Sequence, residues 1–354
     1  MEHYKKDLLN ALEAKEQAQR LACAPIAFHA SKSLRDLGIL TLFLENDGTI
    51  SLDDLNAQLD ISPYGIKVLL DMGLSSGLFT FDDNKYTLTR LGAFIEFDPM
   101  TRANMDFVAD VCYSGMAHLS ESIEKQQPAG LKCLGDWPTV YEGLSQLPEQ
   151  AKQSWFAFDH YYSDRSFPLL LERVFSRSVK TLCDIGANTG KWTRKCCEHT
   201  SEPHITMVDL PQQLAVASKN LEEAGFKDRV TAYPCDLLDT DNTLPEGQDV
   251  YWMSQFLDCF GTEEIVTILS RVAKAMRPDS VVYILELFPD RQTYESAAHT
   301  LNATSLYFTV IANGNSRFYM SDDFLPLIDQ AGLKIDNVED NIGLGHSLVT
   351  CSLK

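Results

Sequence analysis

The sequence predicts an α/β protein with a mainly α-helical N-terminal domain and a C-terminal domain built on a doubly wound sheet. Three observations support this prediction. Apolar residues follow helical spacing through much of the first half, a single short hairpin interrupts that half, and strands alternate with helices after about Val179. We expect the two domains to cover residues 1–165 and 166–354.

The composition is that of a folded and strongly acidic protein. Its 354 residues are 45% apolar, and 50 acidic against 30 basic side chains give a formal net charge of −20. A surface of this charge repels phosphate backbones, so we expect no nucleic-acid partner. No apolar run reaches the ~18 residues of a membrane span, and the N-terminal stretch shows no secretion core. We therefore expect a cytoplasmic protein with no membrane partner.

The nine cysteines are scattered along the chain without a C-x-x-C pair. An odd number of cysteines in a chain of this length, with no export signal, indicates reduced thiols and argues against a zinc site. We expect neither a disulfide framework nor a bound metal ion.

The N-terminal domain is predicted to contain several helices and one hairpin. Ser51 and Ser62, the latter followed by Pro63, offer capped helix starts. A polar turn at residues 82–85 separates two short β-prone runs. Helices are expected at 4–22, 34–44, 51–59 and 63–77, and strands at 78–81 and 86–89. Helix, helix and hairpin in this order are typical of a winged helix-turn-helix.

This winged-helix pattern lacks the side chains of a DNA reader. A recognition helix presents Lys, Arg, Asn or Gln to phosphates and bases. The second helix offers one basic residue, Lys67, together with Asp71, and the hairpin tip carries Asp82 and Asp83. The pattern therefore favours a role in packing or dimerisation.

Residues 101–168 are predicted to form further helices that are rich in aromatic side chains. Phe158 and Tyr162 belong to the densest part of this segment. Aromatic residues at such density either fill a core or line a pocket for a flat ligand. Both alternatives stay open at this stage.

The remainder of the chain alternates apolar, strand-like runs with helix-like stretches. Units of this length form a doubly wound, Rossmann-like parallel sheet. Strands are expected at 179–185, 204–208, 230–234, 249–253 and 280–285, helices at 190–199, 211–224 and 262–276, and two closing strands at 333–338 and 347–352.

The first strand of this sheet leads into a turn with the spacing Gly186-x-Asn188-x-Gly190. Glycine and asparagine tolerate positive φ, and glycine lets the backbone approach a ligand closely. The turn lacks the third glycine of the dinucleotide fingerprint and the Lys-Ser/Thr ending of a phosphate-binding loop. It predicts a ligand-binding turn but leaves the ligand undecided.

Carboxylates stand at the ends of the first three strands, at Asp184, Asp209 and Asp236. Asp209 is placed to accept the two hydroxyls of a ribose, and Asp236 with Leu237 is placed beside an adenine ring. Three carboxylates repel a pyrophosphate but suit a ligand with positive charge. S-adenosylmethionine carries a sulfonium, an ammonium and a ribose diol without phosphate, so charge favours it over NAD.

At these segments the chain resembles class I methyltransferases. More narrowly, residues 184–190, 208–211, 235–237 and 249–251 resemble the small-molecule O-methyltransferase family of plant caffeate and flavonoid enzymes and bacterial antibiotic-tailoring enzymes. The resemblance spans the whole chain. It implies S-adenosylmethionine as cofactor, S-adenosylhomocysteine as product, a small aromatic acceptor, and a homodimer held by winged-helix N-terminal regions.

The resemblance also implies roles for individual residues. Gly186 and Gly190 would approach the methionine part of the cofactor, and the aromatic stretch near Phe158 would close over cofactor and acceptor. The expected cofactor contacts are Asp184, Gly186, Gly190, Asp209, Leu210, Asp236, Leu237 and Ser254, and the expected acceptor contacts are Phe158, Tyr162 and Phe256.

The chain departs from this family at the catalytic base. O-methylating members usually carry K-x-x-L-H-D-W after the fourth strand, and its His deprotonates the acceptor hydroxyl. Here Ser254 stands in place of the Lys, Asp258 in place of the His, and Cys259 in place of the Asp. Glu286 matches one of the two acids that orient the His, whereas residues 314–318 lack the other.

The missing His leaves the base and the methylated atom open. Ionising a phenol of pKa near 10 at pH 7 costs about 4 kcal/mol. Asp258 can act as the base if burial raises its pKa. The substitutes are His118, His160 and His299, of which His160 fits best because it lies in the aromatic segment. We take Asp258, Glu286 and His160 as catalytic candidates.

The acceptor atom is either the phenolic oxygen or the ring carbon beside it. Transfer to the carbon depends on an electron-rich ring and on alignment, and the ring proton leaves only after attack. The loss of the His base therefore favours carbon. Two other interpretations remain: a non-catalytic or regulatory protein that binds S-adenosylmethionine, and a winged-helix DNA regulator.

Overall fold

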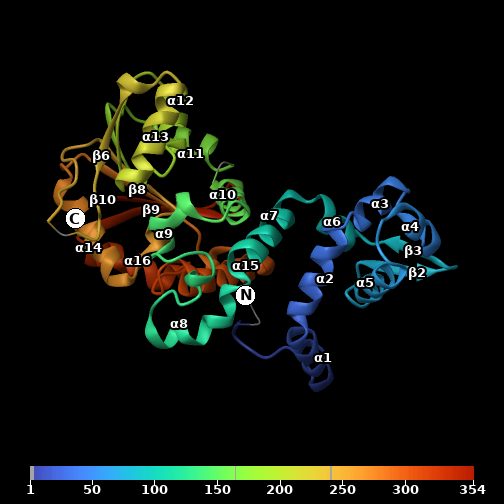
Figure 1. Ribbon diagram of the computed structural model, residues 1–354. Coiled ribbons are helices and arrows are strands. Elements are labelled where there is room, and N and C mark those ends of the chain that lie inside the picture. The colour runs from blue at the N-terminus through green and yellow to red at the C-terminus, as the bar shows by residue number, and fades with distance from the viewer. Residues whose placement is uncertain (1–3, 164, 240) are drawn as a thin grey trace. The chain divides into compact units, whose positions relative to one another are not determined.

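The computed structural model describes residues 4–163, 165–239 and 241–354 (Figure 1). Its internal contacts divide the chain into two compact units, Met1–Ala109 and Asp110–Lys354. Residues 110–165 thus pack with the sheet that follows them, and our functional boundary at 165/166 stays a prediction. Across the described ranges, no helix combines the length and the apolar character needed to cross a bilayer.

The first unit contains seven helices and a small sheet in its described part. The helices are α1 (Ala11–Ala22), α2 (Ala24–Asp36), α3 (Ile39–Glu45), α4 (Leu52–Gln58), α5 (Pro63–Ser75), α6 (Arg90–Phe97) and α7 (Pro99–Phe107). The side chains of Ser51 and Ser62 accept N–H bonds from Asp54 and Gly65, so both predicted caps are confirmed.

The predicted single helix over 34–44 is wrong. The chain ends α2 at Asp36 and begins α3 at Ile39, because Gly38 between them adopts φ +76°. A right-handed helix cannot continue through a left-handed residue. The apolar spacing was nevertheless a correct guide to burial, since Leu34, Leu40 and Phe43 all lie in the core.

The winged hairpin is confirmed. Strands β2 (Phe79–Asp82) and β3 (Lys85–Leu88) are joined by Asp83 and Asn84, both with positive φ as in a two-residue hairpin turn. A third strand, β1 (Thr49–Ser51), was not predicted and pairs antiparallel with β3. The order β1-β3-β2 closes over a core in which the rings of Phe43 and Phe79 stack at 4.7 Å between centroids.

The second unit begins with helices and continues as a layered sheet domain. Its helices are α8 (Leu119–Lys125), α9 (Val140–Gly143), α10 (Glu149–Ser163), α11 (Phe167–Val174), α12 (Lys191–His199), α13 (Pro211–Glu223), α14 (Thr262–Ala275), α15 (Glu295–Tyr307) and α16 (Ser321–Gln330). The alternation of strands and helices in the sequence did not predict α15 and α16. A π-helical segment, Phe308–Ala312, directly extends α15.

The sheet of this unit has seven strands in the order β6-β5-β4-β7-β8-β10-β9. They are β4 (Thr181–Ile185), β5 (His204–Asp209), β6 (Val230–Pro234), β7 (Val250–Ser254), β8 (Val281–Glu286), β9 (Leu333–Ile342) and β10 (His346–Leu353). The first five are parallel, while β10 runs antiparallel to both of its neighbours. The carboxyl ends of the five parallel strands therefore meet at one edge of the sheet.

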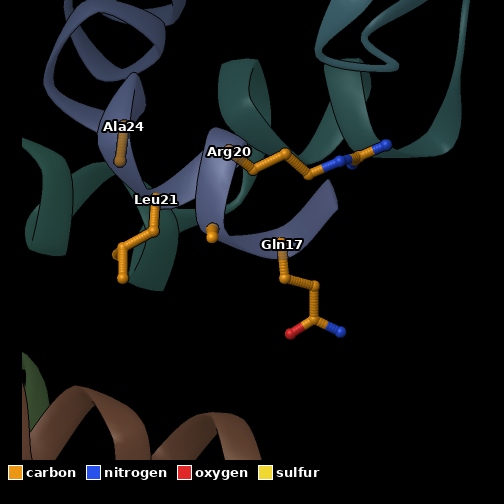
Figure 2. A pocket seen from close by; sticks show the side chains of 5 residues that line it. Gln17, Arg20, Leu21 and Ala24 are labelled. Atoms are coloured by element: carbon orange, nitrogen blue, oxygen red, sulfur yellow. The ribbon is translucent and has the colours of Figure 1, made fainter. Parts of the chain in front are cut away.

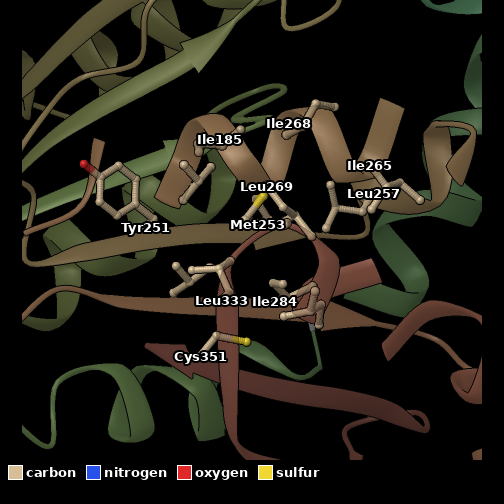
Figure 3. Close-up of a cluster of buried hydrophobic side chains, with 14 of the residues drawn as sticks. Ile185, Tyr251, Met253, Leu257, Ile265, Ile268, Leu269, Ile284, Leu333 and Cys351 are labelled. Carbon is tan, nitrogen blue, oxygen red and sulfur yellow. The ribbon is translucent and has the colours of Figure 1, made fainter. Parts of the chain in front are cut away.

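The sheet buries side chains on both faces. Tyr251 and Met253 of β7 pack with α14, as Figure 3 shows for Ile265 and Leu269. The intervening Trp252 lies on the opposite face, where its ring stacks on Trp192 of α12 at 4.0 Å between centroids. Burial on both faces fixes the strand register, and hence where each strand ends.

Candidate active site

The glycine turn after β4 is built as the sequence predicts. Gly186, Asn188 and Gly190 adopt φ of +77°, +49° and +78°. A Cβ atom on Gly186 would stand 2.3 Å from the ring of Phe256, and one on Gly190 would stand 2.5 Å from the side chain of Leu221. Glycine is therefore required at both positions for two reasons: the backbone conformation is left-handed, and a Cβ atom would clash with a neighbouring side chain.

Asp184 lies buried beneath this turn. Its carboxylate accepts a hydrogen bond of 2.6 Å from the hydroxyl of Thr193 on α12. Burial, with a smaller contribution from the charge of Asp209, raises the pKa of Asp184 to about 7. The hydrogen bond joins β4 to α12, the two elements that the glycine turn connects.

Asp209 ends β5 and faces the turn. Its Oδ2 accepts the N–H of Asn188 at 2.7 Å, and its Oδ1 accepts the N–H of Leu210 at 2.7 Å. Burial raises the pKa of the carboxyl, while these two N–H groups oppose the rise. Each oxygen keeps a lone pair for a further donor, as the hydroxyls of a ribose would require.

The third strand end is more open than the first two. Asp236 is exposed, and its Oδ1 accepts the N–H of Leu238 at 2.9 Å. Leu237 points into the core, whereas Leu238 is 52% exposed. The apolar side chain available to a flat ligand at this edge is thus Leu238, which the sequence analysis did not single out. The roles of Asp236 and Leu237 stay predictions.

The turn after β7 carries the replaced catalytic segment. Ser254 is half-buried at the end of the strand, and Gln255 follows it with φ +46°. The side-chain oxygen of Gln255 lies 2.7 Å from Nε2 of His346, a fully buried residue of β10. Burial lowers the pKa of His346 to about 4, so this ring is neutral near pH 7. No local pattern predicts this contact, which joins residues 91 positions apart.

Glu286 and Asp258 are brought together at this turn. Oε1 of Glu286 accepts the N–H of Leu257 at 2.9 Å and that of Phe256 at 3.2 Å. Asp258 follows in a 3₁₀ turn, Leu257–Cys259, and its Oδ1 lies 3.5 Å from the thiol of Cys259. Both carboxyl groups are buried, with exposed fractions of 5% for Asp258 and 2% for Glu286.

Burial changes the acidity of both groups. It raises the pKa of Asp258 to about 7, and the charge of Asp159 on α10 contributes in the same direction. It also raises the pKa of Glu286 well above its ordinary value, with the charge of Asp258 as the next cause. A carboxyl with a pKa near 7 is suited to accept a proton at neutral pH.

The aromatic candidates lie together on α10. The rings of Phe158 and Tyr162 are 5.1 Å apart between centroids. His160 lies beside Asp159, with 4.0 Å between its Nε2 and the carboxylate, and its ring is 5.8 Å from that of Phe156. Phe256 packs on Gly186 and edge-on against Phe260 at 4.9 Å. A ligand that reaches Gly186 therefore also reaches the ring of Phe256.

These groups define what the edge of the sheet can bind. It presents carboxylates at the ends of β4, β5 and β6, a glycine turn, and a buried acid pair after β7. Such a site attracts a cation and repels a diphosphate. The remaining acceptor lone pairs of the Asp209 carboxylate suit the two hydroxyls of a diol, and the Asp258 carboxyl can take up a proton.

Comparisons with known proteins agree with this description. Residues 167–334 match the family described as an O-methyltransferase domain, and residues 15–86 match a dimerisation2-like domain. The chain is 24% identical over 312 residues to the L-tyrosine C(3)-methyltransferase of Streptomyces lavendulae, covering 86% of this chain and 83% of that protein.

Two further matches differ in extent. The 3-amino-4-hydroxybenzoate 4-O-methyltransferase of Streptomyces cremeus is 28% identical over 160 residues, which cover 45% of this chain and 42% of that protein. The crystal structure of the S-adenosylmethionine-dependent methyltransferase SibL in its apo form superposes with a TM-score of 0.71 at 23% identity, over 94% of this chain and 98% of that one. This likeness confirms the predicted fold.

Proposed function

This chain is an S-adenosylmethionine-dependent methyltransferase with an O-methyltransferase domain behind a dimerisation-type domain, and we propose that it methylates a small phenolic acceptor at the ring carbon beside the hydroxyl. The observation that carries the choice of carbon is the match over 312 residues to a protein named for methylation at a carbon of tyrosine, and Asp258 is the base proposed to activate the acceptor. A buried carboxyl, held next to Glu286, occupies the position of the usual His base.

The residues at the sheet edge fit S-adenosylmethionine. Gly186 and Gly190 hold the left-handed turn where a side chain would clash with Phe256 or Leu221, and we propose that the backbone of this turn faces the methionine part of the cofactor. Asp209 is held by two N–H groups and keeps lone pairs for the ribose hydroxyls. We propose that Asp184, Leu210, Asp236, Leu237 and Ser254 complete the cofactor contacts. When bound, S-adenosylmethionine supplies a methyl group from its positively charged sulfur and leaves as S-adenosylhomocysteine.

The relatives support an aromatic acceptor. One is named for methylation of tyrosine at C3, a ring carbon, and it matches most of this chain. The other is named for methylation of a phenolic oxygen, and it matches under half. We assign carbon to this chain because the extended match agrees with the loss of the His base.

Asp258 is proposed as the base that activates the ring. The phenolic O–H bond breaks, its proton moves to the Asp258 carboxylate, and the electron pair left on oxygen enriches the neighbouring ring carbon. That carbon uses a ring electron pair to bond the methyl group, while the pair of the broken C–S bond stays on sulfur. Once Asp258 has passed its first proton on, its carboxylate accepts the proton of the methylated ring carbon, and the C–H electron pair returns to the ring and restores aromaticity. The Asp258 carboxyl then delivers this proton to the phenolate oxygen of the product.

Other side chains are proposed to position the acceptor. Phe158, Tyr162 and Phe256 offer aromatic faces on which a flat ring packs. His160, beside Asp159, is proposed to carry the proton onward, since the charge of Asp159 acts on Asp258. Glu286 holds the turn and so sets the position of Asp258.

We also propose that the chain forms a homodimer through its N-terminal helices. Helix α1 has no buried residue among those described, and Leu12, Leu21 and Ile26 are 66%, 77% and 65% exposed. Figure 2 shows a shallow hollow here, lined by Gln17, Ala18, Arg20, Leu21 and Ala24. A second copy would cover this apolar surface, in keeping with the dimerisation-type domain over residues 15–86.

The test of the proposed function identifies the product. The purified protein is incubated with methyl-¹³C-labelled S-adenosylmethionine and a panel of phenols that includes L-tyrosine and 3-amino-4-hydroxybenzoate. Carbon NMR then separates an aryl C-methyl group from an O-methyl group. A C-methyl product supports the proposal, and an O-methyl product alone overturns the choice of carbon. Binding of S-adenosylhomocysteine with no product from any phenol favours a non-catalytic role.

A further inference from the structure

Tyr141 on α9 buries a hydroxyl that has no oxygen or nitrogen partner among the described residues, and the side chain that interacts with it is the thiol of Cys259, a weak hydrogen-bonding group. Two buried tyrosines of this unit, Tyr319 and Tyr251, satisfy theirs. The hydroxyl of Tyr319 donates to the carbonyl of Phe260 at 2.6 Å, and that of Tyr251 lies 2.8 Å from the carbonyl oxygens of Pro245 and Ala275. A buried polar group without a partner destabilises the fold, so its presence calls for another explanation.

The surroundings of this hydroxyl are polar and chemically distinctive. The titratable groups that act on Tyr141 are the thiol of Cys259, the hydroxyl of Tyr307 and the carboxyl of Asp258. They come from two separate places, because Asp258 and Cys259 belong to the 3₁₀ turn after β7 and Tyr307 ends α15. The Tyr307 hydroxyl is fixed because it accepts the indole N–H of Trp155 at 2.7 Å.

We propose that the Tyr141 hydroxyl, together with Cys259 and Tyr307, binds the phenolic oxygen of the acceptor and sets it beside Asp258. This inference rests on the proposed function and names the part of the acceptor that these three residues recognise. The O–H of Tyr141 donates to the phenolic oxygen, and the phenolic O–H points to Asp258. When that proton moves to the Asp258 carboxylate, the Tyr141 donor stabilises the negative oxygen that remains.

The negative charge around the Tyr141 hydroxyl favours an acceptor with an uncharged oxygen over one with a carboxylate. Asp258, Glu286 and Asp159 are acidic groups that act on one another or on Tyr141. Among the described residues, no Lys or Arg is a cause of the change in the pKa of Asp258 or of Glu286. A carboxylate placed here would meet like charges without a cation, whereas a neutral phenol brings both a donor and an acceptor.

The test uses phenol and toluene as matched probes. Protein saturated with S-adenosylhomocysteine is titrated with each probe by ligand-observed NMR, as wild type, Tyr141→Phe and Tyr251→Phe. We expect wild type to prefer phenol to toluene, and Tyr141→Phe to lose about tenfold in phenol affinity, the effect of one hydrogen bond. Toluene binding should not change.

Stability separates a binding role from a structural one. Tyr141→Phe removes an unpartnered hydroxyl, so its thermal midpoint should equal or exceed that of wild type. The control Tyr251→Phe removes a hydroxyl that is hydrogen-bonded, so it should lower the midpoint while leaving phenol affinity unchanged. A lowered midpoint for Tyr141→Phe with unchanged phenol affinity would overturn the proposal.

Two further outcomes would also overturn it. They are the absence of a phenol-over-toluene preference in wild type, and equal phenol affinity in wild type and Tyr141→Phe. Neither outcome bears on the proposed function, which the methylated product reports separately. Conversely, failure to bind S-adenosylhomocysteine in calorimetry counts against the proposed function, whatever the two probes do.

Discussion

Oε1 of Glu286 lies 2.9 Å from the backbone nitrogen of Leu257, and this hydrogen bond anchors the turn that carries the candidate base. Glu286 ends β8, and Leu257 follows β7, its parallel neighbour. The pairing of these two strands therefore fixes where Asp258 stands. This gives Glu286 a positioning role in a chain that has no His at position 258 to orient.

Asp258→Asn should lower the rate of methyl transfer by about 10² to 10⁴, the usual contribution of a general base. Binding of S-adenosylhomocysteine in calorimetry should stay as in wild type, because Asp258 is proposed to act on the acceptor and not on the nucleoside. Asp329→Asn, an exposed aspartate of α16, serves as the matched control and should leave the rate unchanged. Equal rates for wild type and Asp258→Asn would assign the base elsewhere.

The pH dependence of the rate should report the same residue. Because the pKa of Asp258 is about 7, its carboxylate form, which accepts protons, becomes populated as pH rises through that value. The rate under limiting acceptor should therefore increase from about pH 6 to about pH 8 and then level off. Asp258→Asn should lose this step, and a profile that keeps it would count against the assignment.

Asp209→Ala should abolish measurable binding of S-adenosylhomocysteine. The substitution removes the proposed acceptor of the ribose hydroxyls and also releases the N–H of Asn188 in the glycine turn. Asp209→Asn keeps one oxygen and separates these effects, since it should retain the fold while weakening binding. Calorimetry measures both variants. Wild-type affinity in Asp209→Ala would show that the nucleoside does not bind at the end of β5.

Gly186→Ala should cost both stability and cofactor affinity. Gly186 and Gly225 share a left-handed backbone, with φ of +77° and +81°, but only Gly186 has a neighbour in the path of a Cβ atom. Gly225→Ala should therefore lose only about 1–2 kcal/mol of unfolding free energy from backbone strain. Gly186→Ala should lose more in urea denaturation, because the ring of Phe256 must move, and it alone should weaken S-adenosylhomocysteine binding.

Asp184 should make the protein less stable as pH rises. Its pKa is about 7 in the folded protein against an ordinary value of 3.8, so the folded state keeps a proton that the unfolded state has lost between these values. The free energy of unfolding therefore decreases from about pH 4 to about pH 7. Asp184→Asn should show a shallower decrease in urea denaturation series, and a slope equal to that of wild type would contradict the burial argument.

Leu21→Glu should convert the proposed dimer into monomers. Leu21 is 77% exposed on α1, and a charge there opposes burial against a second copy. Light scattering should report a mass near twice 39.7 kDa for wild type and near 39.7 kDa for the variant. Tyr294→Glu, at an equally exposed aromatic outside α1, is the control and should stay dimeric. A monomeric wild type would remove the dimer proposal.

The elements predicted best are those defined by neighbouring residues. Ser51 and Ser62 cap their helices as expected, and the carboxyl ends of β4, β5 and β6, at or near Asp184, Asp209 and Asp236, meet at one sheet edge. The errors lie where a single backbone angle or a distant contact decides. Gly38 divides one predicted helix into two. Helices α15 and α16, which both lie between β8 and β9, were not predicted from the alternation of strands and helices.

The sequence by itself determined the fold class, the acidic cofactor edge and the loss of the family's His. These features follow from local spacing and residue type, because parallel strands always bring their carboxyl ends to one edge. Only the tertiary structure decided the raised pKa of Asp258, the hydrogen bond between Glu286 and the turn at Leu257, and the unpartnered hydroxyl of Tyr141. Burial and hydrogen bonding set all three, and both depend on which distant segments close around a side chain.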